Sequence, residues 1–252
     1  MDKNFGHYDL KQFMEDLEEL NIPLSDQQIS QFIKYYELLI EWNSFMNLTA
    51  ITDFDEILKK HFIDSLSIVK AFDEMKEDIR SKKVRLIDVG TGAGFPGIPL
   101  KIAFPNFDIT LLDSLHKRIK FLDEVVNQLS LVRISPIHGR AEDYAKPDKL
   151  REKYDLCVSR AVANLSTLSE YCLPFVKKEG LFISYKSEKL IEELREAEKA
   201  VSILGGKIEN QIYFPLPSSD INRNLLIIKK IKNTPSKFPR KAGLPAKEPI
   251  RV

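Results

Sequence analysis

The 252-residue chain is 43% hydrophobic and 30% charged, which suits one or two globular α/β units with a substantial core. It has no run of about 18 apolar residues, which excludes a helical membrane span, and its first residues lack the features of a secretory signal. Cys157 and Cys172 have neither metal-site spacing nor the number that a disulfide framework needs. We therefore expect a cytoplasmic protein without a metal site.

The net charge of +1 hides an uneven distribution. Residues 1–60 carry 5 Lys or Arg against 12 Asp or Glu, whereas residues 61–252 carry 33 against 25. A basic C-terminal part is compatible with a polyanionic partner on one face of the molecule.

The first 80 residues are predicted to form a helical extension. Ser25 and Asp26 form an N-cap signal, and apolar residues follow at helical spacing. A second helical pattern runs through residues 57–69, and a polar-aromatic turn is expected between them at residues 42–49. His61 and Asp64 share one face of the second helix, where they either orient that helix locally or lie over a ligand pocket.

Residues 81–232 are predicted to form an α/β core in which strands alternate with helices. Strands are expected at residues 84–89, 107–112, 132–138, 154–159 and 181–185, and helices at residues 96–104, 115–129, 165–176 and 188–204. Two further strands, residues 207–214 and 224–231, are joined by a loop too short for a helical crossover and should be antiparallel. The prediction is a Rossmann-like, seven-stranded, mostly parallel sheet with a terminal antiparallel hairpin and helices on both faces.

Residues 233–252 form a basic tail with four prolines, which we expect to prevent regular structure. Such a tail is either solvated and disordered or an arm that contacts phosphates.

A glycine-rich loop, Gly90-Thr91-Gly92-Ala93-Gly94, follows the first core strand, and its glycines allow a tight turn and close approach of a ligand to the backbone. With Asp88 it spells D-x-G-x-G-x-G, which is typical of S-adenosylmethionine-dependent methyltransferases. Residues 92–97 also satisfy the dinucleotide pattern G-x-G-x-x-G, so a nicotinamide or flavin enzyme is the alternative. The terminal hairpin, in place of a second nucleotide-binding half, favours the methyltransferase.

Further cofactor contacts are expected at the ends of the next strands. Asp113 can accept hydrogen bonds from both ribose hydroxyls. Ala141 and Glu142 follow the third strand, where they can read the adenine edge, although Glu142 is equally well placed as an acid favoured by a helix dipole. Arg160 ends the fourth strand and is our candidate beside the reaction centre, where it binds the cofactor carboxylate or the edge of a guanine.

The residues after the fourth strand also narrow the chemistry. Methyltransferases that act on base amines usually carry Asn/Asp-Pro-Pro-aromatic here, whereas this chain has Ser159-Arg160-Ala161-Val162. Cys157 lies in an apolar strand and is expected to be an inert, packed thiol rather than the nucleophile that carbon-5 methylation needs. A ring nitrogen with a free lone pair, such as guanine N7, requires alignment with the methyl donor but no general base.

Several segments, in order along nearly the whole chain, resemble one family. They are Trp42-Asn43, Asn47-Leu48-Thr49, residues 61–66, residues 88–97, residues 113–118, residues 139–142, residues 159–163 and residues 239–245. Together they resemble the bacterial 16S rRNA (guanine-N7) methyltransferase G family, also called glucose-inhibited division protein B. Ala242 departs from the proline that is common in this tail, but the basic pair before it is intact.

The resemblance implies methyl transfer from S-adenosylmethionine to N7 of a guanine in 16S rRNA of the small ribosomal subunit. It implies cofactor contacts at Gly90, Phe95, Ala141, Glu142 and Arg160. From the motif itself, we expect further cofactor contacts at Gly92, Gly94 and Asp113. We expect RNA contacts at Lys186, Arg240 and Lys241, and a monomer. A small-molecule methyltransferase and a non-catalytic ribosome-assembly factor are the alternatives.

Overall fold

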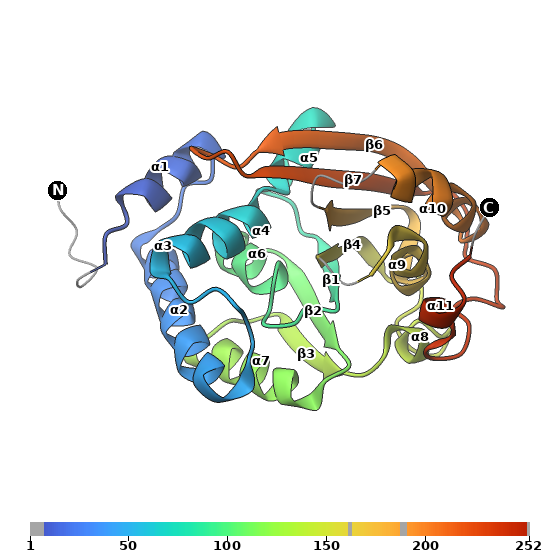
Figure 1. Ribbon diagram of the computed structural model, residues 1–252, viewed down its shortest axis with the longest axis horizontal. Coiled ribbons are helices and arrows are strands. Elements are labelled where there is room, and N and C mark those ends of the chain that lie inside the picture. The colour runs from blue at the N-terminus through green and yellow to red at the C-terminus, as the bar shows by residue number, and fades with distance from the viewer. Residues whose placement is uncertain (1–7, 161–162, 187–190, 251–252) are drawn as a thin grey trace.

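The computed structural model describes residues 8–160, 163–186 and 191–250, and within them seven strands form one sheet between two layers of helices (Figure 1). The strands are β1 (Arg85–Val89), β2 (Asp108–Asp113), β3 (Ile134–His138), β4 (Tyr154–Arg160), β5 (Val176–Lys186), β6 (Gly206–Pro215) and β7 (Asn222–Lys230). The α-helices before the sheet are α1 (Lys11–Glu19), α2 (Asp26–Met46), α3 (Phe54–Ile57), α4 (Asp64–Leu66) and α5 (Val69–Glu74). Those that follow β1 are α6 (Gly97–Ala103), α7 (His116–Gln128), α8 (Ala141–Tyr144), α9 (Leu165–Cys172), α10 (Ile191–Ile203) and α11 (Leu244–Lys247).

The strand order is β3-β2-β1-β4-β5-β7-β6, and the predicted mostly parallel sheet is confirmed. Strands β1 to β5 pair in parallel, whereas β7 is antiparallel to both β5 and β6. The predicted terminal hairpin is therefore also confirmed. Because the chain runs outward from β1 through β2 to β3 and then returns to β4, the order reverses between β1 and β4, where sheets of this kind bind ligands.

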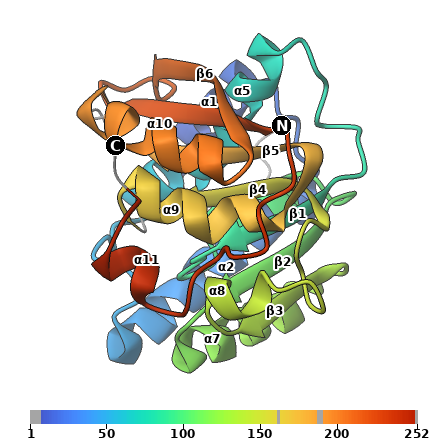
Figure 2. The same cartoon turned by 90° about the vertical axis from the view of Figure 1, so that its right-hand side faces the viewer.

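Each face of the sheet has its own hydrophobic core, because side chains alternate across every strand. Leu86 packs with α2, α6 and α7 on one face, and the next residue, Ile87, packs with α9 and α10 on the other. Figure 2 shows α8, α9, α10 and α11 together on this second face. The N-terminal helices and the first face share one continuous core, so residues 8–80 are part of the same packed body.

The N-terminal helix α2 begins where the sequence predicted. The Ser25 side chain accepts from the backbone N–H of Gln28, and the Gln28 side chain accepts from the N–H of Ser25, so the two form a capping box. The helix ends later than predicted, at Met46, so the expected turn at residues 42–49 is wrong over its first half. Asn47, in the left-handed conformation with φ 51°, ends the helix.

The second predicted helix, residues 57–69, is not one α-helix. Residues Leu58–Ile63 form a π-helix between α3 and α4, and α5 begins only at Val69. Sequence periodicity does not distinguish one π turn within an α-helical pattern. Single π turns of this kind frequently occur at functional sites.

Strand β5 starts five residues before the predicted strand, at Val176. The helix predicted for residues 165–176 ends at Cys172, where a 3₁₀ turn with Pro174 near its start, Leu173–Phe175, takes over. Proline lacks the N–H that another α-helical turn would need. The segment therefore changes to strand earlier than its apolar pattern indicates.

The tail is ordered through residue 250, which contradicts the expectation that its prolines prevent regular structure. It packs along α9, it contains the short helix α11, and Pro245 lies in the first turn of that helix, where no N–H is needed. Phe238 is buried, and Lys230 donates to the carbonyls of Leu173 and Val176 beside the start of the tail. The tail is part of the fold.

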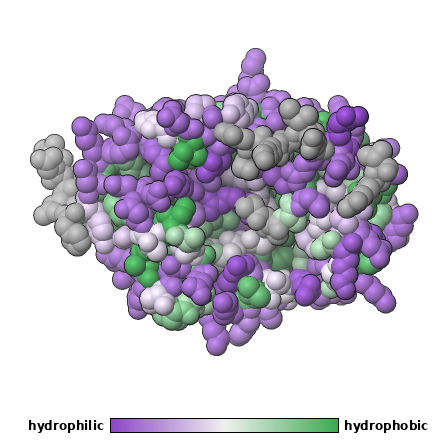
Figure 3. Space-filling view, viewed as in Figure 1, coloured by the Kyte–Doolittle hydropathy of each residue, from purple (hydrophilic) through white to green (hydrophobic). Residues whose placement is uncertain are grey.

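Hydrophilic side chains cover most of the face seen in Figure 3, and the apolar ones on it are scattered. In the part of the chain that the structure describes, no helix has both the length and the apolar character needed to cross a membrane.

Candidate functional site

A cavity of about 500 Å³ lies at the carboxyl ends of β1, β2, β3 and β4, at the reversal of strand order. Its size is within the range of small-molecule and cofactor sites. Its walls are formed by residues 48, 49, 61, 89–93, 95, 112–114, 118, 139–142, 160 and 171. Seven of the eight predicted cofactor residues are among them: Gly90, Gly92, Phe95, Asp113, Ala141, Glu142 and Arg160.

The glycine loop is held by the carboxylate of Asp88. One Asp88 oxygen, Oδ2, accepts from the Thr91 hydroxyl at 2.6 Å and from the backbone N–H of Gly97 at 2.9 Å. Burial raises the Asp88 pKa to about 7, because water no longer stabilises the charged form. Within the described part of the chain, the other oxygen, Oδ1, has no hydrogen-bond partner. Asp88 thus connects the loop to the start of α6.

Gly94 is the predicted cofactor residue that lies outside the cavity wall. It has φ 100°, and a Cβ at this position would lie 2.5 Å from Ile98 Cδ1 and 2.8 Å from the Tyr35 hydroxyl oxygen. That hydroxyl donates to the carbonyl of Ala93 at 2.5 Å. The glycine is therefore explained by the close approach of α2 to the loop, and its predicted contact with a cofactor stays a prediction.

Asp113, at the end of β2, is oriented by hydrogen bonds from neighbouring residues. Its Oδ2 accepts from the backbone N–H of Gly92 at 2.9 Å and from Arg118 Nη1 at 3.1 Å, and its Oδ1 accepts from the N–H of Leu115 at 2.9 Å. The carboxylate is almost fully buried and lies in the cavity wall. A diol placed beside the glycine loop would meet this carboxylate.

Glu142 faces the other end of the cavity. It lies in the first turn of the short helix α8, and its Oε1 accepts from the backbone N–H of Gly243 at 2.7 Å. Glu142 is thus an early-helix acid, as one alternative had it, and it also lines the cavity, whereas contact with an adenine edge stays a prediction. The bond to Gly243 brings the tail to the edge of the cavity, which the sequence did not predict.

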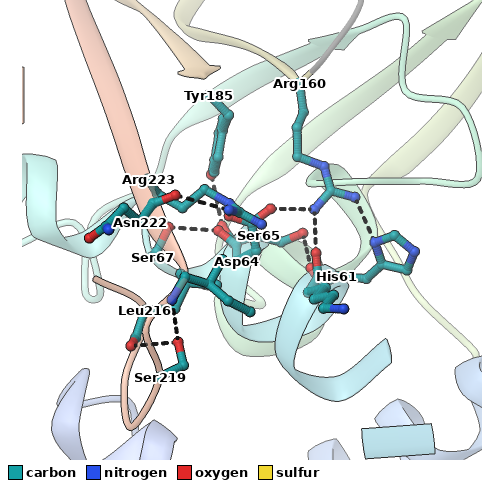
Figure 4. Close-up of polar contacts among 12 residues, drawn as sticks. His61, Asp64, Ser65, Ser67, Arg160, Tyr185, Leu216, Ser219, Asn222 and Arg223 are labelled. Atoms are coloured by element: carbon teal, nitrogen blue, oxygen red, sulfur yellow. Dashed lines mark hydrogen bonds and ion pairs between the residues drawn. The ribbon is translucent and has the colours of Figure 1, made fainter. Parts of the chain in front are cut away.

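Arg160 extends from the end of β4 into a network of side chains from three other segments (Figure 4). Its Nη1 donates to Asp64 Oδ2 at 2.8 Å, and Arg223 Nε from β7 donates to Asp64 Oδ1 at 2.8 Å. Asp64 is only 3% exposed, so two guanidinium groups neutralise one buried carboxylate. The Arg160 guanidinium carbon lies 4.9 Å from the centroid of the Phe95 ring, within the range of a cation–π contact. Arg160 is therefore fixed in direction beside the cavity.

His61 shows that the π-helix lies over the cavity, which was one of the two alternatives for this segment. Its imidazole stacks on the Phe95 ring with centroids 4.6 Å apart, and its Nδ1 accepts from Arg160 Nη2 at 3.3 Å. Burial first, and the positive charge of Arg160 second, lower the His61 pKa to about 4. The ring is therefore neutral near pH 7. Sequence reasoning found the His61–Asp64 pair but not the arginines that it meets.

The three predicted RNA-binding residues differ in whether their charges form ion pairs within the protein. Lys186 Nζ lies 2.6 Å from Glu193 Oε1, and Arg240 forms a paired contact with the buried carboxylate of Glu170, at 2.7 Å for the closest N···O. Lys241, the next residue, is exposed. The structure thus gives Arg240 a clear structural role, and RNA contact at Lys186, Arg240 and Lys241 stays a prediction.

Two further observations concern the chemistry. Cys157 is fully buried, so the predicted packed position of this thiol is confirmed, and burial raises its pKa, which is consistent with an inert cysteine. Ala161 and Val162, which replace the base-amine tetrapeptide, lie outside the described residues. Among the residues that are described, no group of three or more His, Cys, Asp or Glu side chains is placed to hold a metal ion.

Comparison with known proteins gives one consistent result. Residues 28–218 match the model of the family described as rRNA small subunit methyltransferase G. A protein of Lachnoclostridium phytofermentans named Ribosomal RNA small subunit methyltransferase G is 54% identical over 94% of this chain and 96% of its own length. A protein of the same name from Acetivibrio thermocellus is 52% identical over 95% of this chain and 96% of its own length.

Solved structures show the same fold at low sequence identity. A methyltransferase from Haloferax volcanii, solved with its activator, superimposes with a TM-score of 0.53 at 12% identity, covering 77% of this chain and 98% of its own. TrmN from Thermus thermophilus has a TM-score of 0.50 at 14% identity, covering 69% of this chain and 53% of its own.

Proposed function

The chain belongs to the rRNA small subunit methyltransferase G family, and from that premise we propose that it transfers the methyl group of S-adenosylmethionine to N7 of a guanine in 16S rRNA. The acceptor is the RNA of the small ribosomal subunit, and the protein acts as a cytoplasmic monomer. The observation that carries the proposal is the cavity that joins the glycine loop, Asp113 and Glu142 to Arg160 at one end of the sheet.

The residues of this cavity fit S-adenosylmethionine group by group. Asp113 offers a buried carboxylate to the two ribose hydroxyls. Ala141 and Glu142 would hold the adenine, where a backbone N–H and a carboxylate can read the amine-bearing edge of the base. Gly90 and Gly92 leave room for the ligand beside the backbone. When bound, S-adenosylmethionine supplies an electrophilic methyl group on a sulfonium.

The residues around Arg160 suit an acceptor that loses no proton. A base amine must release a proton during methylation, whereas guanine N7 uses a free lone pair. The basic groups on this side of the cavity are Arg160, which is a cation, and His61, whose pKa of about 4 makes it a very weak base. The site therefore favours catalysis by alignment, in which the walls hold the base and the methyl donor in line.

RNA contact is proposed for the exposed cations at the rim. Arg140 is exposed and lies in the cavity wall beside the adenine end, and Lys241 is exposed where the tail passes Glu142. Both can contact phosphates without breaking an internal ion pair. Lys186 and Arg240 must first exchange a carboxylate partner, so we expect smaller contributions from them.

The decisive experiment is direct. Small subunits that lack the modification are incubated with the protein and S-adenosylmethionine labelled in its methyl group, and the modified base is mapped. Label at N7 of one guanine in 16S rRNA is the expected result. Label on a small molecule alone, or RNA binding without methyl transfer, would support the two alternative functions instead.

A further inference from the structure

Thr49 lies in the cavity wall contributed by the N-terminal helices, on a segment that is held rigidly. The Asn43 side-chain oxygen accepts from the backbone N–H of Leu48 at 2.7 Å and of Thr49 at 2.9 Å. These two bonds fix the chain directly after α2. The Thr49 side chain is thereby held next to His61, with 2.8 Å between Thr49 Oγ1 and His61 Nε2.

The direction of each hydrogen bond around Thr49 follows from Arg160. A guanidinium can only donate, so His61 Nδ1, which lies 3.3 Å from Arg160 Nη2, must accept. A neutral imidazole carries one hydrogen, and this leaves it on Nε2. His61 Nε2 therefore donates to Thr49 Oγ1.

The Thr49 oxygen is then saturated as an acceptor. It accepts from His61 Nε2 at 2.8 Å and from the backbone N–H of Ile51 at 3.1 Å, and a hydroxyl oxygen has two lone pairs. Its own hydrogen is still available, and among the described residues no acceptor is placed to take it. Thr49 is half-buried in the wall of the cavity, so the hydrogen is available to a ligand there.

We propose that Thr49 donates this hydrogen to O6 of the target guanine and thereby selects guanine over adenine. This inference rests on the proposed function. Guanine presents N7 and O6 side by side on one edge, and N7 must stay free for the methyl group. On this edge, O6 is therefore the acceptor that a hydrogen-bond donor can bind. Adenine carries an amino group at this position, and Thr49 has no lone pair left to accept from it.

The base, rather than the cofactor, is assigned to Thr49 because of where the cofactor-binding groups lie. Asp113, Glu142 and the glycine loop all follow strands of the sheet. Thr49 and His61 come from the N-terminal segment, on the wall beyond Phe95. We therefore assign the side of the cavity at Thr49 to the base.

The first test compares Thr49→Val, which keeps the shape but removes the hydroxyl, with Thr49→Ser, which keeps the hydroxyl. Thr110→Val is the matched control, because the Thr110 hydroxyl accepts from Tyr154 on β4 and lies outside the cavity wall. Thr49→Val also leaves the His61 Nε2–H and the Ile51 N–H without their acceptor, so it should lower kcat/KM for small subunits by at least the roughly fivefold to tenfold expected for the one lost bond to the substrate. Affinity for S-adenosylhomocysteine should stay within about twofold. Thr49→Ser should restore the activity, and Thr110→Val should leave it unchanged.

The second test removes O6 instead of the hydroxyl. Small subunits are reconstituted with 16S rRNA that carries 2-aminopurine, which keeps N7 but has no O6, at the mapped target. The unmodified enzyme should lose activity on this substrate, and Thr49→Val should lose little more, because both changes remove the same bond.

Two outcomes would overturn the inference while leaving the proposed function intact. One is that the losses from Thr49→Val and from 2-aminopurine multiply. The other is that Thr49→Val weakens S-adenosylhomocysteine binding as much as it slows methylation. An unmodified enzyme that leaves guanine N7 unmethylated would instead overturn the proposed function, and the inference with it.

Discussion

Replacing Asp64 with Asn should both destabilise the fold and slow methylation, because Asp64 orients Arg160 beside the cavity. Asp64 is the carboxylate that pairs with both Arg160 and Arg223, with both N···O distances 2.8 Å. The side chains of these arginines are 14% and 22% exposed, so water compensates part of the lost attraction. We therefore expect a loss of about 2–4 kcal/mol, below the full value for a wholly buried ion pair.

Such a loss should lower the melting temperature by about 5–10 °C in a chain of this size. Because Arg160 also loses its direction beside the cavity, kcat/KM for methylation should fall by about tenfold. The measurements are a thermal unfolding curve and a methylation assay on undermethylated small subunits, made at a temperature where the variant is folded.

The matched control is Asp16→Asn. Asp16 is 1% exposed and forms an ion pair with Lys59, outside the cavity wall. The Asp16→Asn substitution should destabilise the protein without slowing methylation by the folded fraction. The reasoning would be refuted if Asp64→Asn left methylation unchanged, or if Asp16→Asn slowed it to the same extent.

Three further predictions concern other parts of the molecule. Gly94→Ala should lower the free energy of unfolding by about 2–4 kcal/mol, because the new Cβ meets Ile98. Gly243 also has a positive φ, 84°, but open space around it, so Gly243→Ala should lower the free energy of unfolding by only about 1 kcal/mol in chemical denaturation. The His61 ring should show no NMR titration above about pH 5, because its folded pKa is about 4. Since this pKa is below the ordinary 6.5, the neutral ring contributes stability above pH 6.5, and that contribution is lost as the pH falls toward 4. A titration midpoint near 6.5 would contradict the buried, neutral ring. Glu170→Gln should make the tail more sensitive to limited proteolysis, since it weakens the pairing with Arg240, and an unchanged digestion rate would count against this anchor.

The sequence predicted the framework because the framework depends on local patterns. Alternating strands and helices, the short link between the last two strands and the capping residues of α2 are all recorded in neighbouring residues. The glycine loop and the residues that end β2, β3 and β4 could also be placed together, because parallel strands end at one edge of a sheet. For this reason seven of the eight predicted cofactor residues line one cavity.

The local errors have equally local physical causes. Helix α2 continues through Met46 because its polar and aromatic residues do not prevent a helical backbone. The end of the helix is decided at Asn47, which adopts the left-handed conformation. The tail prolines prevent long regular structure but permit one turn when proline is at its start, as Pro245 is in α11.

Tertiary structure alone decided the partners of the charged groups. Asp64 meets Arg160 and Arg223, which are 96 and 159 residues away in the chain, and Glu142 meets the backbone of Gly243 across 101 residues. Gly94 lies against Tyr35 of another helix as well as against Ile98, which is near it in the sequence. Periodicity and motif spacing carry no information about such contacts, since they arise only when distant segments pack. The sequence alone thus determined the sheet, the methyl-donor motif and the family, whereas packing determined which charges are paired inside the protein and which are exposed.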